Sequence, residues 1–148
     1  MGLFDRVSGT RRTTESNFSP AEAYAAIMLV AVASDGYLSD DEAQGLSTSL
    51  SRMQLFRSYP GDVTRKMFDR LLSILQRQGI KDLLNMALAV LPHDLYETAF
   101  AMATDLVLAD GEVTQKEEEL LNDLHRALEI PEEEAIKIID VMVIKNRG

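Results

Sequence analysis

Seven carboxylates gather around two Asp-Gly turns, and oxygen ligands of this kind suit a hard cation. The turns are Asp35-Gly36 and Asp110-Gly111. The carboxylates in or just after them are Asp35, Asp40, Asp41, Glu42, Asp110, Glu112 and Glu117. Oxygen-rich clusters without His or Cys favour Ca²⁺ or Mg²⁺ over zinc or copper. We therefore expect weak divalent-cation binding through Asp35, Glu42, Asp110 and Glu117, supplemented by the other three, and no organic cofactor.

Helix capping accounts for part of the same pattern. Ser39 with Glu42, and Thr114 with Glu117, have the spacing of a capping box, and Asp before Gly is a common turn pair. Capping does not require Asp35, which leaves the cation interpretation open. An EF-hand is excluded, because that loop places ligands at alternate positions ahead of its glycine. Both interpretations stand at this point: a cation site, or turns that are only caps.

The two turns belong to an internal repeat. With the glycines aligned, Val32 coincides with Val107 and Leu46 with Leu121. Each copy has an apolar helix, an Asp-Gly turn and a capped second helix, which is typical of a duplicated supersecondary unit. We expect residues 20–78 and 94–144 to superpose as two pseudo-symmetric halves.

Helical periodicity without any alternating strand pattern predicts an all-α fold of about seven helices in a single compact bundle. The expected helices start near Pro20, Asp40, Asp62, Lys81, Asp94, Gln115 and Pro131. Asp62 is expected to cap the third helix, and Gly79 to end it. The first helix, about 20–34, is expected to start with a capping box of Ser19 and Glu22. It is apolar almost all round and should be central and buried. Residues 19–148 form this domain. Residues 1–18 are predicted to be a flexible tail with a short amphipathic start at Leu3, Phe4 and Val7.

Composition excludes several classes of function. The 148 residues carry a net charge of -9, which is unsuited to nucleic-acid binding, and no cysteine, which excludes disulfides and thiolate chemistry. The longest apolar run, Ala25–Ala33, is far shorter than the ~20 residues of a transmembrane helix. His93 and His125 have no nucleophile nearby in the sequence, so we expect no catalytic activity.

At the two turns the chain resembles the TerB-like tellurite-resistance family. The motif is an apolar helix ending in Ala-x-Asp-Gly, with a Glu six residues after the Gly. Here it is Ala33-Ser34-Asp35-Gly36 with Glu42, and Leu108-Ala109-Asp110-Gly111 with Glu117. The start, Met1-Gly2-Leu3-Phe4-Asp5-Arg6-Val7, is also similar to the family's N-terminus. Leu108 departs from the usual Ala, without affecting a carboxylate.

This resemblance implies a cytoplasmic, non-enzymatic helical protein of tellurite resistance and stress response. It implies metal binding by Asp35, Glu42, Asp110 and Glu117, and a membrane-bound protein partner of the same system that would place the chain peripherally at the membrane. The alternative is a structural adaptor or interaction domain whose Asp-Gly turns are only helix caps.

Overall fold

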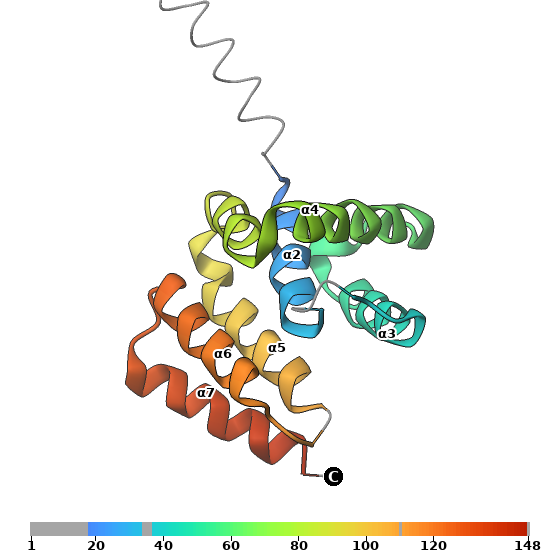
Figure 1. Ribbon diagram of the computed structural model, residues 1–148. Coiled ribbons are helices and arrows are strands. Elements are labelled where there is room, and N and C mark those ends of the chain that lie inside the picture. The colour runs from blue at the N-terminus through green and yellow to red at the C-terminus, as the bar shows by residue number, and fades with distance from the viewer. Residues whose placement is uncertain (1–17, 34–36, 110, 148) are drawn as a thin grey trace, which may run out of the picture.

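The computed structural model describes residues 18–33, 37–109 and 111–147, and every regular element in these ranges is helical (Figure 1). The elements are α2 (Pro20–Val32), α3 (Asp40–Ser51), α4 (Gly61–Leu88), α5 (Tyr96–Leu108), α6 (Gln115–Ala127) and α7 (Glu132–Lys145), with short 3₁₀ turns η1 (Gln54–Phe56) and η2 (His93–Leu95). The all-α prediction is confirmed.

Helix α2 lies at the centre of the fold. Its N-terminus carries the predicted capping box, in which Ser19 Oγ accepts from the Glu22 N–H and the Glu22 carboxylate accepts from the Ser19 N–H. Every residue from Ala23 to Ala31 is buried. A helix without a solvent face must be covered all round, and α4 and α5 both pack on it. The predicted central position of this helix is confirmed.

One polar group lies inside this apolar layer. The Tyr24 hydroxyl is fully buried, and no residue of the described ranges gives it a hydrogen bond. Burial raises the pKa of Tyr24, because the phenolate would lose its hydration there. The ring itself packs edge-on against Phe56, with 6.4 Å between the ring centroids. Tyr24 is therefore held by its ring and not by its hydroxyl.

The other helices form two groups on either side of α2. In Figure 1, α3 and α4 lie toward one side, and α5, α6 and α7 toward the other. Helix α3 packs on α4, whereas α6 and α7 both pack on α5. Helices α6 and α7 thus reach the centre of the protein mainly through α5.

The count of helices differs from the prediction at α4. The third and fourth expected helices are one element, Gly61–Leu88, so the described ranges contain six α-helices. Gly79 has φ 92° and ψ 170° inside it, and this non-helical geometry bends the element where the sequence predicted a break. The predicted cap at Asp62 is wrong: the cap is Pro60, and Asp62 lies in the first turn, where its charge favours the helix dipole.

The expected tail, residues 1–18, lies almost entirely outside the described residues. Its last residue, Phe18, is 2% exposed and belongs to the core. The Arg70 guanidinium carbon lies 5.4 Å from the centre of the Phe18 ring, and Arg70 also pairs with Glu22. Phe18 and its contacts with α4 therefore fix the point from which the N-terminal segment departs.

Two glycines make a matched pair for testing the bend. Gly79 has a backbone geometry that is essentially restricted to glycine, whereas Gly45 lies exposed in regular helix α3. An added Cβ would meet no atom within 4 Å at either site, so only the backbone distinguishes them. We expect Gly79→Ala to lower the free energy of unfolding by about 1–3 kcal/mol and Gly45→Ala to raise it by about 0.5–1 kcal/mol. Urea denaturation measures both, and a stabilising Gly79→Ala would contradict the bend.

Candidate functional site

Both predicted capping boxes at the repeated turns are present. The Ser39 N–H donates to Glu42 Oε1 at 3.0 Å, and the Glu42 N–H donates to Ser39 Oγ at 3.1 Å. The second box repeats this with Thr114 and Glu117 at 2.9 Å and 3.1 Å. Each box satisfies backbone N–H groups that a helix start would otherwise leave without partners. The helix starts thus account for one carboxylate oxygen of Glu42 and one of Glu117.

The remaining predicted ligands have different surroundings. Asp35 and Asp110 lie outside the described residues. Asp40, Asp41 and Glu112 are exposed, and Asp40 Oδ1 lies 3.4 Å from the Arg65 guanidinium. Across residues 18–33, 37–109 and 111–147, no three His, Cys, Asp or Glu side chains are grouped so as to hold a metal ion. The described part of each turn therefore supplies at most part of a cation site.

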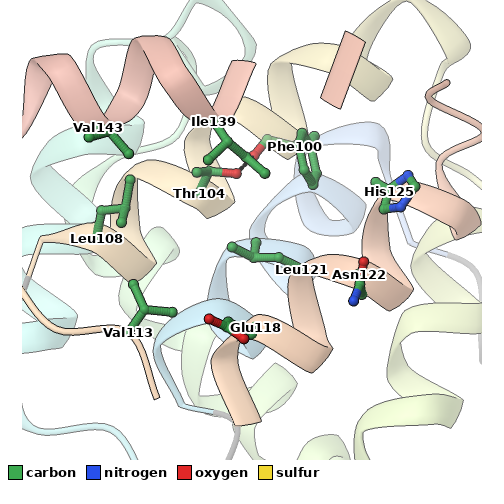
Figure 2. A pocket seen from close by; sticks show the side chains of 10 residues that line it. All are labelled: Phe100, Thr104, Leu108, Val113, Glu118, Leu121, Asn122, His125, Ile139 and Val143. Carbon is green, nitrogen blue, oxygen red and sulfur yellow. Dashed lines mark hydrogen bonds between the residues drawn. The ribbon is translucent and has the colours of Figure 1, made fainter. Parts of the chain in front are cut away.

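A groove between α6 and α7 was not predicted from the sequence (Figure 2). Its volume is about 400 Å³. Residues of α5 form its floor, while α6 and α7 form its walls. The lining residues are Phe100, Thr104, Leu108, Val113, Glu118, Leu121, Asn122, His125, Ile139 and Val143. Because most of these side chains are apolar, the groove suits an apolar occupant.

The two polar groups deepest in the groove already have partners. Thr104 Oγ1 donates to the Phe100 carbonyl at 2.8 Å, a bond within α5. His125 Nδ1 lies 3.1 Å from the Ile130 carbonyl oxygen, and its ring meets Phe100 edge-on at 6.3 Å between centroids. Each of these two side chains is therefore bonded to a backbone carbonyl of the protein itself. Both groups would keep these hydrogen bonds if an apolar side chain occupied the groove.

Helix α7 exposes several large apolar side chains beside this groove. Ile136, Val141 and Ile144 are 50%, 56% and 60% exposed, and Val143 is 38% exposed. Of the residues Glu132–Lys145, all of which are described, only Ala135 is buried. The sequence analysis identified α7 but not this surface. The sequence does contain a signal for it: apolar residues occupy every position from 138 to 144 except Asp140. This run has more apolar residues than one packing face of a helix needs.

A pair of carboxyl groups lies on the other side of α7. A second hollow of about 430 Å³ is lined by residues of α5 and α7, including Glu97, Glu134 and Val141. A hydrogen bond and Coulombic repulsion from Glu134, with a smaller desolvation effect, raise the pKa of Glu97 above its usual value. Because Glu97 is fully exposed to solvent, screening weakens this repulsion. The pair is a local feature of the α5–α7 contact.

The two histidines both have structural partners. His93 stacks on Tyr96 with 4.5 Å between ring centroids, and its Nε2 lies 3.9 Å from Glu129 Oε1. His125 bonds the backbone at the end of α6, as described above. These contacts account for the positions of both rings without a substrate.

Comparisons with protein-family models, curated proteins and solved structures find no match to this chain. The resemblance to the TerB-like family therefore rests on the two Asp-Gly motifs and the N-terminal residues alone. None of the helices in the described ranges combines the length and the apolar character needed to cross a membrane.

Proposed function

We propose that this protein is a non-catalytic helical module of the TerB-like, tellurite-resistance and stress-response kind, which binds a protein partner and, weakly, a divalent cation. In this proposal it acts in the cytoplasm, peripherally to the membrane through a membrane-bound partner. The proposal includes the finer architecture implied by the repeat: a compact bundle in which residues 20–78 and 94–144 are two pseudo-symmetric halves.

The observation that carries the proposal is the exposed apolar surface of α7. Val141 and Ile144, which we call the α7 outer pair, are each more than half exposed. Neighbouring large apolar side chains on a surface mark sites of protein association more often than chance exposure does. Helix α7 packs on α5 and makes few contacts with any other described helix. The outer pair is thus available to a partner.

The cation part of the proposal rests on the carboxylates of the two turns. Glu42 and Glu117 hold equivalent positions, each the third residue of a capped helix after an Asp-Gly turn. Each cap uses Oε1, and the carboxylate is oriented by that bond. Asp35 and Asp110 would complete each site with Ca²⁺ or Mg²⁺, and the cation would relieve the repulsion between neighbouring carboxylates.

A second candidate is a structural adaptor whose Asp-Gly turns are only caps. The complete capping boxes favour it, because they explain Glu42 and Glu117 without a ligand. The ion pair of Asp40 with Arg65 similarly gives one further predicted ligand a structural role. The two candidates share partner binding and differ in their response to divalent cations.

Photo-cross-linking in cells tests partner binding. A photoreactive residue in place of Val141 should form adducts with a membrane-associated protein, since a bound partner would cover this side chain. The same residue in place of Val63, a 43% exposed side chain on α4, is the matched control and should form none. Equal adducts at both positions, or none at position 141, would count against the proposed surface.

Melting curves with and without Ca²⁺ or Mg²⁺ distinguish the two candidates. A cation at ten times its dissociation constant adds about 1.4 kcal/mol of stability, because it binds only the folded state. For a chain of this size that raises Tm by about 3–6 °C. Asp35→Asn with Asp110→Asn should abolish the rise.

The control replaces two exposed acidic residues outside both turns, one in the second part of α4 and one in η2: Asp82→Asn with Asp94→Asn should keep the rise. If millimolar Ca²⁺ and Mg²⁺ leave the Tm of the unmodified protein unchanged, the cation site is contradicted. The second candidate, in which the Asp-Gly turns are only helix caps, is then supported.

A further inference from the structure

We propose that the N-terminal segment of this same chain, residues 1–12, docks in the groove between α6 and α7. Leu3, Phe4 and Val7 would be its anchoring side chains. This inference does not depend on the α7 outer pair or on the cation sites, so its test is separate from the tests of the proposed function.

The groove suits an apolar occupant. Its floor and walls include Leu108, Leu121, Ile139 and Val143, and its volume of about 400 Å³ is large enough for more than one bulky side chain. An apolar side chain in the groove would cover apolar surface of the lining residues and gain van der Waals contacts with them. With Thr104 and His125 bonded to backbone carbonyls, the occupant needs no polar group in the depth of the groove.

The N-terminal segment has the matching apolar pattern. Leu3, Phe4 and Val7 are spaced i, i+1 and i+4 and would lie on one side of a helical turn. The remaining residues up to Arg12 are polar, charged or glycine, apart from Met1. A short apolar cluster followed by polar chain is the pattern of a segment that anchors at one end.

Charge complementarity favours the same occupant. Glu118 lines the groove, and the exposed residues Glu112 and Asp140 adjoin its lining residues Val113 and Ile139 in the sequence. Residues 1–12 contain three arginines, Arg6, Arg11 and Arg12, and one aspartate, in a chain whose net charge is -9. Attraction between Glu118 and the arginines of the segment would steer the segment toward the groove.

The connecting chain, when extended, is longer than the helix that forms the floor of the groove. Residues 8–17 provide ten residues between Val7 and the buried Phe18, and an extended chain of ten residues spans up to about 33–36 Å. Helix α5, which forms the floor of the groove, has 13 residues and is about 20 Å long. The tether starts at the residue pair before α2, and α2 packs directly on α5, the helix that forms the floor of the groove.

Paramagnetic NMR on the full chain tests the proposal. The chain has no cysteine, so Ser8→Cys accepts a single nitroxide label. We expect the label to attenuate the methyl signals of Val113, Leu121 and Val143 strongly and to leave that of Val63 on α4 unchanged. Adding Leu3→Ser with Phe4→Ser should restore the signals, because the anchors are lost. Attenuation that is absent, or that survives this double substitution, overturns the proposal.

A matched pair on α7 tests the groove itself. Val143 lines the groove, whereas its neighbour Ile144 is more exposed and does not. Val143→Asp should abolish the attenuation at Leu121, and Ile144→Asp should preserve it. If Val143→Asp impairs folding, Val113→Asp in the loop before α6 serves instead. A labelled chain mixed with an isotope-enriched, unlabelled chain should show no attenuation, and attenuation in that mixture would mean that a second copy is the occupant, contradicting the proposal.

Discussion

The structure depends on covering α2 completely. Nine consecutive residues, Ala23–Ala31, are buried, which no single neighbouring helix can achieve. Alanine at positions 21, 23, 25 and 26 lets neighbouring helices approach closely, while Ile27, Met28 and Leu29 fill the space between them. Covering a helix on all sides requires more than one neighbouring element. Helix α4 on one side and α5 on another meet that requirement.

This constraint divides the protein into an inner layer and an outer layer. Helices α4 and α5 contact α2, while α6 and α7 pack on α5. An outer helix needs only one apolar face, so apolar residues beyond that face stay at the surface. On α7 these are Ile136, Val141, Val143 and Ile144. Helices α6 and α7 each pack on α5, and the space between them is the groove of Figure 2. The candidate binding surfaces therefore result from the way the core is built.

Local signals in the sequence predicted the helices and their starts well. Ser19-Glu22, Ser39-Glu42 and Thr114-Glu117 form the predicted capping boxes, because capping depends on residues only three apart. The prediction of a cap at Asp62 also rested on a local signal, and it was wrong. An acidic residue near a helix start can act as a cap or sit in the first turn, and its position relative to Pro60 decides which.

The groove and the exposed side of α7 could not be derived in the same way. Both depend on which face of α7 contacts α5, and a helix that is apolar at most positions gives no preferred face. The sequence could have signalled only the excess of apolar residues. Of the predicted cation ligands, the structure places Glu42 and Glu117 in caps and Asp40 beside Arg65, whereas Asp35 and Asp110 lie outside the described residues.

Native-state hydrogen exchange tests the layered account most directly. The amides of Ala25–Leu29 in α2 should exchange only through global unfolding, because no smaller opening exposes them. The amides of Lys137–Val141 in α7 should exchange through a local opening of lower free energy, since α7 lies in the outer layer. Equal protection of the two helices, or faster exchange in α2 than in α7, would contradict the central role of α2.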